Sequence, residues 1–207
     1  MTPPSPTKGE RRAQILEAAL ACFARRGYHL TTMDDIVAES GLSKGSLYWH
    51  YNSKKEILLA TMDWYFERLA VDFEAVLQES PTPLGMLQVV GDRFAEILAA
   101  MDPVLQVMLD FYAETRHDEA VNAALNNILV PYIDMVEGVI QAGIEAGEIR
   151  PVHARQMAIA IMAALDGVGV YQMMLDAPVD WGATGRQLVD VLLAGLRAQS
   201  PTGGDAP

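Results

Sequence analysis

Two side chains suited to binding DNA, Lys44 and Tyr48, stand four residues apart within the segment 31–57. This spacing places both on one face of a helix, and that face is polar and aromatic rather than apolar. In a DNA major groove, a lysine ammonium can reach a phosphate or a guanine edge, and a tyrosine can bond a phosphate or touch a thymine methyl group. The pattern therefore predicts contact with duplex DNA.

Further polar side chains lie close to this pair in the sequence. Ser46 and His50 fall at the same end of the predicted helix, and Lys54 and Lys55 begin the next helix. Backbone N–H groups at a helix start also favour phosphate. His50 fits either a DNA contact or a histidine that packs between helices, and Tyr51 fits the core better than the groove.

Short helices with clear start signals must position these groups. Thr32 and Asp35 form a capping-box pattern, Ser43 is a good N-cap, and Ser53 with Glu56 forms a second box. The tight turn Ser40-Gly41-Leu42-Ser43 is typical of a helix-turn-helix. Apolar residues should pack this pair against a preceding helix at 10–27, which ends at Gly27: Ile36, Val37, Leu42 and Leu47.

The remainder of the chain also has helical periodicity and no strand-like alternation, which predicts an all-α fold of about nine helices. The expected later helices span about 54–78, 84–101, 103–116, 119–146, 152–175 and 181–198. Pro131 should kink or split the helix at 119–146. The segment 157–175 is apolar, but Asp166 near its centre favours a buried helix over a membrane span.

The segment from Ile15 to Leu58 resembles the TetR family of regulators. The matching residues are Ile15-Leu16-x-Ala18-Ala19-x-x-x-Phe23, Gly27, Thr31-Thr32-x-x-x-Ile36, Gly41-Leu42-Ser43-Lys44-Gly45-Ser46-Leu47-Tyr48-Trp49-His50-Tyr51 and Ser53-Lys54-Lys55-Glu56-Ile57-Leu58. Val37 and Tyr51 depart from the commoner alanine and phenylalanine.

The resemblance implies a DNA-binding domain at 8–53, a helical ligand-binding and dimerisation domain at 54–199, and flexible tails at 1–7 and 200–207. It implies a repressor that binds a near-palindromic operator as a homodimer, with half-sites about 34–36 Å apart or a multiple of that distance. Leu47 and Trp49 should mainly pack. The implied DNA contacts are Thr32, Ser43, Lys44, Ser46, Tyr48, His50 and Lys54.

The resemblance also implies a dimer through the last two helices, although their apolar residues also suit an intramolecular core. Small residues there permit close approach: Ala160, Ala163, Ala164, Gly167 and Gly169. A small-molecule pocket should be lined by adaptable Met and aromatic side chains, which equally suit a core: Trp64, Phe94, Met101, Met108, Phe111, Tyr112, Met135, Met162 and Tyr171. Asp110, Glu114 and Asp166 interrupt apolar patterns and need partners or exposure.

Charge is divided unevenly along the chain. The net charge is −12, but residues 1–60 carry eight Lys or Arg and six Asp or Glu, a net of +2, and the rest carries −14. This asymmetry fits two regions with different partners, or an acidic surface with a chance lysine cluster. The single cysteine, Cys22, and the absence of an apolar leader in 1–10 suit a cytoplasmic protein with no membrane partner.

No nucleophile–base pair, phosphate-binding loop or metal-ligand spacing is present, so we expect no enzyme, no cofactor and no metal. The neighbours His117, Asp118 and Glu119 do not share a helix face. Three alternatives stay open beside the ligand-released repressor. They are a DNA-binding regulator or activator without a sensor, a helical enzyme, and a protein-interaction module.

Overall fold

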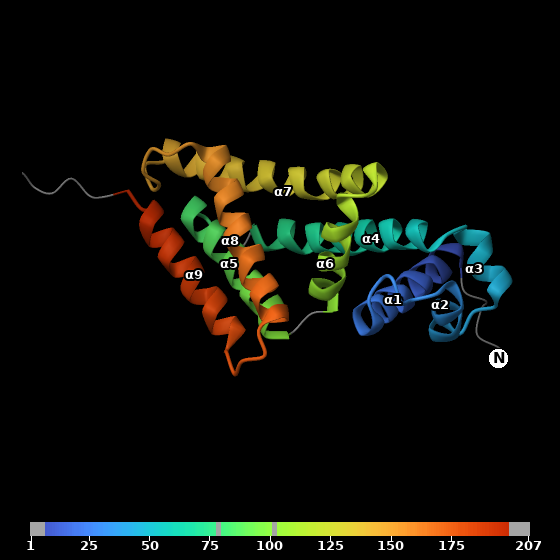
Figure 1. The fold of residues 1–207 in the computed structure, drawn as a ribbon. Helices are drawn as coiled ribbons and strands as arrows, with labels where there is room; N and C mark the ends of the chain where they lie inside the picture. Colours follow the sequence, from blue (N-terminus) through green and yellow to red (C-terminus); the bar gives the residue numbers. More distant parts are fainter. Residues whose placement is uncertain (1–6, 78–79, 101–102, 199–207) are drawn as a thin grey trace, which may run out of the picture. The chain divides into compact units, whose positions relative to one another are not determined.

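The computed structural model describes residues 7–77, 80–100 and 103–198, and these ranges contain nine α-helices and no strand (Figure 1). The helices are α1 (Lys8–Arg26), α2 (Met33–Ser40), α3 (Lys44–His50), α4 (Lys54–Leu77), α5 (Pro83–Ala100), α6 (Pro103–Thr115), α7 (Glu119–Glu145), α8 (Ala154–Met174) and α9 (Trp181–Leu196). The all-α prediction is confirmed.

The chain forms two compact units, neither of which is continuous in sequence. Unit 1 comprises residues 1–69 and 103–128, and unit 2 comprises 70–102 and 129–207. The expected domain boundary at 53–54 therefore lies inside unit 1. The reason is that unit 1 includes the first part of α4, all of α6 and the start of α7, in addition to the predicted DNA-binding segment.

Side-chain caps define the first helices of unit 1. Thr32 and Asp35 form the predicted capping box at α2, and the Ser43 hydroxyl accepts a hydrogen bond from the Ser46 amide at α3. Gly27 ends α1 at φ 78°, a conformation that favours glycine. The predicted tail 1–7 ends at Thr7, which forms a capping box with Glu10 at the start of α1. This cap is not among the predicted ones.

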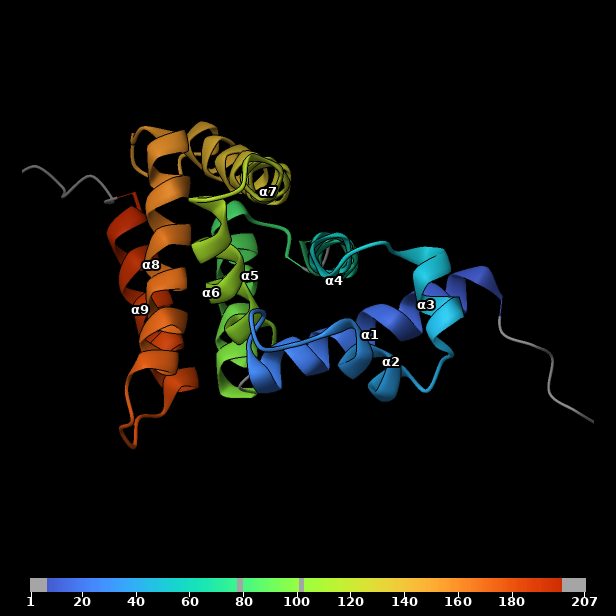
Figure 2. The same cartoon turned by 45° about the vertical axis from the view of Figure 1, so that its right-hand side comes forward.

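The core of unit 1 joins α1 to α2, α3 and α6. Phe23, Ile36, Leu47 and Phe111 are fully buried. Figure 2 shows α1 and α2 side by side with α3 beyond them, and α6 packs against α1. The second predicted box is realised differently, because Ser53 caps the Glu56 amide while the Glu56 carboxylate accepts from the amide of Asn52 at 2.7 Å.

Unit 2 packs α5, α8 and α9 side by side, as Figures 1 and 2 both show. Glycines allow α5 and α9 to approach closely, since a Cβ on Gly91 would lie 2.5 Å from Val189 and one on Gly182 would lie 2.8 Å from the Cβ of Ala99. An apolar cluster fills the core: Leu87, Val136, Ile140, Ile149, Ala154, Ala158, Leu165, Val189, Leu193 and Leu196.

The structure bears on two expectations about the long helices. α7 runs continuously through Pro131, so the proline does not split it, and the Pro131 side chain is exposed. α8 is not a mostly buried helix, because it buries one face and leaves Ile159, Tyr171 and Met174 exposed. By length and composition alone, α7 and α8 are also apolar enough to cross a membrane, a test that core helices of globular proteins pass as well.

Candidate functional site

The predicted pair Lys44 and Tyr48 lies on one exposed face of α3. The Lys44 ammonium stands 6.0 Å from the centre of the Tyr48 ring, and Tyr48 is 43% exposed. Lys44 also forms an ion pair with Asp34 of α2 at 2.7 Å, and this hydrogen bond raises the pKa of the lysine. Both groups are largely exposed, so the pair can exchange for a phosphate at little cost.

Two of the predicted DNA contacts, Thr32 and Ser43, cap helices in the free protein. The Thr32 hydroxyl accepts from the Asp35 amide at 3.1 Å and donates to the Asp35 carboxylate at 2.7 Å. Hydrogen bonds from Thr32 lower the pKa of Asp35. The Ser43 hydroxyl caps α3 but keeps its own proton free to donate, because it serves there only as an acceptor.

A cleft of about 460 Å³ lies between the start of α1 and α3. It is lined by Lys8, Arg11, Ser43, Gly45, Ser46, Trp49 and His50. It joins three predicted DNA contacts, Ser43, Ser46 and His50, to two cations that the sequence reasoning had not selected. The signal that could have found them was the run of basic residues at positions 8–12, which falls on the first turns of α1.

This environment favours the neutral form of His50, because it lowers the pKa of the imidazole. Its side chain is half-buried, and burial lowers its pKa, with further lowering by the charges of Lys8, Arg11 and Arg12. A cluster of cations around a neutral imidazole repels cations and attracts phosphate. The cleft therefore has the electrostatic character of an anion site.

The prediction that Leu47 and Trp49 both pack is half right. Leu47 is fully buried, but Trp49 is 67% exposed at the mouth of the cleft. The Lys8 ammonium stacks 5.0 Å from the centre of a Trp49 ring, and the His50 ring meets it edge-on. Residues two apart on a helix point to different faces, so only one of the two can reach the core.

Lys54 differs from the other predicted contacts. Its ammonium donates to the backbone carbonyl oxygens of Tyr28, His29 and Thr31 at 2.5, 3.1 and 2.7 Å. Partial burial lowers the pKa of Lys54. Its three donors are thus already occupied by the turn between α1 and α2, whereas Lys55 pairs with Asp118 at 2.7 Å.

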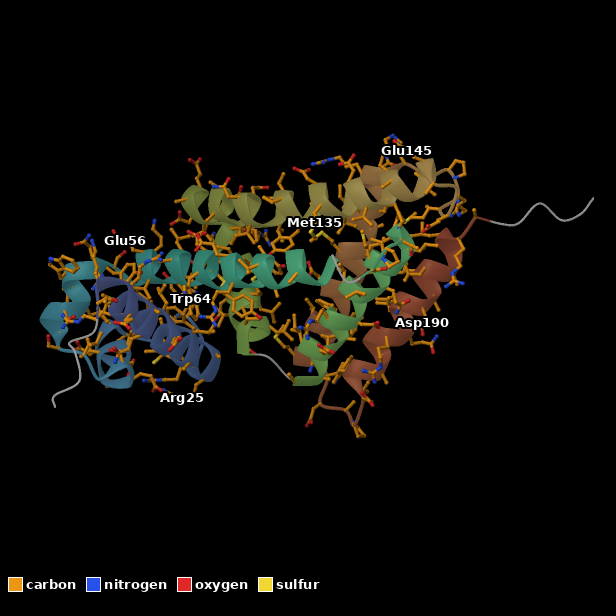
Figure 3. The ribbon with its side chains drawn as sticks, turned by 180° about the vertical axis from the view of Figure 1, so that it is seen from behind. Arg25, Glu56, Trp64, Met135, Glu145 and Asp190 are labelled. Atoms are coloured by element: carbon orange, nitrogen blue, oxygen red, sulfur yellow. The ribbon has the colours of Figure 1, made fainter. Side chains whose placement is uncertain are left out.

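The predicted pocket residues are divided between the two units. Met108 and Phe111 are buried in unit 1, where Tyr112 and Trp64, labelled in Figure 3, are half-buried. The Arg68 guanidinium lies 5.0 Å from the centre of a Trp64 ring. Phe94, Met135 and Met162 are half-buried in unit 2, where Met135, also labelled in Figure 3, packs on the core cluster. Tyr171 is exposed, and Met101 lies outside the described residues.

A small apolar cavity in unit 2 involves a predicted pocket residue. Its volume is about 40 Å³, and Met162 lines it together with Leu87, Val136, Leu165 and Val189 among others. A cavity of this size has room for about one water-sized group rather than for an organic ligand.

Two acidic residues of α6, Asp110 and Glu114, find partners in the turn between α1 and α2. The Asp110 carboxylate accepts from the Tyr28 amide at 2.6 Å, and Glu114 pairs with His29 at 3.1 Å. Asp118 pairs with Lys55 and also caps α7 by accepting from the amides of Ala120 and Val121. The acidic side of α6 therefore faces the turn between α1 and α2.

Comparison with known proteins agrees with this arrangement. Residues 15–61 match the family described as bacterial regulatory proteins of the tetR family, and residues 88–198 match the C-terminal domain of BetI-type transcriptional repressors. The second match alone covers more than half of the chain.

Similar proteins span nearly the whole chain. The regulator TtgR of Pseudomonas putida is 30% identical over 91% of this chain and 92% of its own length. The fatty acid metabolism regulator of Bacillus subtilis is 26% identical over 91% of this chain and 97% of its own length. A regulator from Saccharomonospora viridis, solved in complex with choline, shares the fold with a TM-score of 0.81 and 23% identity, covering 93% of this chain and all of that one.

The matched residues include α2 and α3 with their caps, the turn at Gly41, and the buried side of α1 that supports them. The chain therefore belongs to the TetR family and is a DNA-binding transcriptional regulator.

Proposed function

We propose that this protein is a cytoplasmic repressor that binds a near-palindromic operator as a homodimer and leaves it when a small molecule binds. The observation that carries the DNA-binding part is the exposed polar face of α3 beside a cation-lined cleft. Lys44 and Tyr48 are suited to base edges and phosphates, and the cleft to the flanking backbone. The cleft adds Lys8, Arg11 and Trp49 to the expected contacts.

The test of DNA binding is fluorescence anisotropy with duplexes that tile the DNA beside the protein's own gene. Duplexes selected from a random pool by the protein provide a second source. Lys44→Ala and Tyr48→Ala should each weaken binding to one near-palindromic duplex by about tenfold or more. Binding that is indifferent to both variants would contradict the proposal. Arg68→Ala, on α4, is the matched control for loss of a positive charge.

The homodimer is supported by the exposed side of α8. Ala160, Ala163, Gly167, Tyr171 and Met174 follow one another along this side at helical spacing. A Cβ on Gly167 would meet nothing within 4 Å, so this strip is open in one protomer. Small residues let helices approach closely, and the apolar side chains supply area that favours association.

Sedimentation velocity tests the interface. Ala163→Glu places a charge in the middle of the strip and should convert the dimer to a monomer, since an unpaired charge is costly to bury. Ala177→Glu, in the exposed turn after α8, is the control and should leave the dimer intact. A dimer that withstands Ala163→Glu would place the interface elsewhere.

The effector part is supported by the relatives. Choline is bound in the Saccharomonospora viridis regulator, and the Bacillus subtilis relative is named for fatty acid metabolism. Choline and a long-chain fatty acid are therefore the first compounds to add to the preformed protein–DNA complex. Release of the duplex identifies an inducer. Failure of a wider compound screen would favour a regulator that acts without a sensor.

A further inference from the structure

The turn between α1 and α2 fixes where the helix-turn-helix begins. Gly27 takes a positive φ, and the Thr31 hydroxyl donates to the Gly27 carbonyl at 2.8 Å. Thr31 is 1% exposed, and Thr32 then caps α2. Movement of this turn would shift the start of α2, which in turn packs against α3.

Two charged side chains hold the turn from different helices. Lys54, at the start of α4, binds three of its carbonyl oxygens, and its ammonium lies 4.4 Å from the centre of the Tyr28 ring. Asp110, on α6, accepts the Tyr28 amide proton. Lys54 thus donates hydrogen bonds to carbonyl oxygens of the turn, and Asp110 accepts one from an amide of the turn. Both residues and the turn belong to unit 1.

We infer that Lys54 and Asp110 are positioning residues for operator binding, which clamp the turn 27–31, and that Lys54 is not a phosphate contact in this protein. The inference rests on the proposed DNA-binding function. Three hydrogen bonds would have to break before the Lys54 ammonium could turn to a phosphate. Charge-assisted bonds of this kind are among the stronger ones in proteins.

The clamp and simple electrostatics predict opposite results for Asp110. Removing a negative charge from a DNA-binding unit should strengthen its attraction to DNA. Removing the acceptor that holds the Tyr28 amide should loosen the turn and weaken operator binding. The sign of the change in affinity therefore separates a positioning role from a general effect of charge.

Lys54 is tested by the salt dependence of binding. Lys54→Met, measured by anisotropy on a duplex already shown to bind the wild-type protein, should weaken binding by about tenfold. The slope of log K against log salt should change no more than in Lys55→Met, the control for loss of one neighbouring charge. Lys44→Met should reduce the slope by about one, as expected for loss of a phosphate contact. The same reduction in Lys54→Met would overturn the inference.

Asp110 is tested by two substitutions and one control. Asp110→Ala should weaken binding to the same duplex several-fold, and Asp110→Asn, which keeps an acceptor oxygen, should restore most of the affinity. Glu67→Ala removes an exposed negative charge from α4 in the same unit, away from the turn, and should not weaken binding. Tighter or unchanged binding by Asp110→Ala would overturn the inference.

Hydrogen exchange without DNA separates the clamp from global stability. Both Lys54→Met and Asp110→Ala should speed exchange of the amides at 28–32 while leaving the buried amides of α1 at 15–23 protected. Equal loss of protection in both segments would mean general destabilisation and would contradict a local clamp. Because this measurement needs no operator, it remains decisive if the proposed DNA binding fails.

Discussion

The segment around α2 and α3 and the α5–α8–α9 core of unit 2 are built by different kinds of contact. In the first, Thr32, Ser43, Lys54 and Asp110 set backbone positions through directional hydrogen bonds. In the second, a cluster of aliphatic side chains and close glycine contacts fill a volume. The contrast shows that specific hydrogen bonds supplement apolar packing where a surface must match DNA, whereas the core of unit 2 depends mainly on shape and apolar area.

The largest effect should come from the core of unit 2. Ile140 on α7 is fully buried, and Ile140→Ala should lower the free energy of unfolding by about 2–5 kcal/mol, because it removes apolar contacts and leaves a cavity. Urea unfolding followed by circular dichroism measures the change. Val130→Ala, on the exposed side of the same helix, is the control and should cost far less. If Ile140→Ala lowers the free energy of unfolding only slightly, the contrast between the core of unit 2 and the segment around α2 and α3 fails.

The neighbours Leu47 and Trp49 separate packing from binding within α3. Trp49→Ala should leave the free energy of unfolding nearly unchanged, since the side chain is exposed, while weakening binding to the selected duplex several-fold, because Trp49 lines the cleft and holds Lys8. Leu47→Ala should instead destabilise the protein by about 2–5 kcal/mol. Thermal unfolding and anisotropy, run on both variants, check this. A destabilised Trp49→Ala would restore the packing role that the sequence predicted.

A smaller effect is expected at the α2 cap. Thr32→Ala removes both capping hydrogen bonds to Asp35 and should lower the free energy of unfolding by about 1 kcal/mol. Thr32→Ser keeps the hydroxyl and should retain most of the stability. If Thr32→Ala proves fully stable yet binds DNA poorly, the hydroxyl serves the phosphate rather than the helix, and the comparison becomes sharper.

The smallest effect is a dependence of DNA binding on pH at His50. In the free protein, burial lowers the pKa of His50, and Lys8, Arg11 and Arg12 lower it further, so the ring is neutral near pH 7. A phosphate in the cleft would favour the charged ring and raise this pKa, so that binding takes up a proton. Operator affinity should therefore rise a few-fold as pH falls from 8 to 6.

His50→Gln should remove this rise, because glutamine does not titrate. His29→Gln is the control, since His29 pairs with Glu114 outside the cleft and should leave the pH dependence in place. Anisotropy at several pH values and constant salt measures both. A pH dependence that survives His50→Gln would place the titrating group elsewhere.

The sequence predicted most of the local structure that one short motif determines, with the exception of the Ser53–Glu56 box, in which the Glu56 carboxylate accepts from the Asn52 amide. The caps at Thr32 and Ser43 are present, and Gly27 and Gly41 take positive φ values. These features depend on residues within about four positions of one another, so the pattern alone contains the needed information. The prediction of a helix-turn-helix with Lys44 and Tyr48 on an exposed face follows from this local pattern.

The sequence failed wherever a side chain's partner lies far along the chain. Lys54 looked free for phosphate because its acceptors, the carbonyls of residues 28, 29 and 31, carry no signature in the side-chain sequence. Asp110 contacts a backbone amide 82 positions away. The exposure of Trp49 likewise depends on how α1 and α3 meet, which helical periodicity does not specify over a seven-residue helix.

The discontinuity of unit 1 has a practical consequence for protein engineering. If only residues 1–69 of this chain were grafted onto a related regulator to transfer DNA specificity, the grafted turn 27–31 would lack the Asp110 carboxylate that accepts its amide proton. Asp110 belongs to the segment 103–128 and would stay behind. A working chimera must import α6 and the first turns of α7 together with the DNA-contacting helices. The transferable module of this regulator is therefore two separate stretches of gene rather than one.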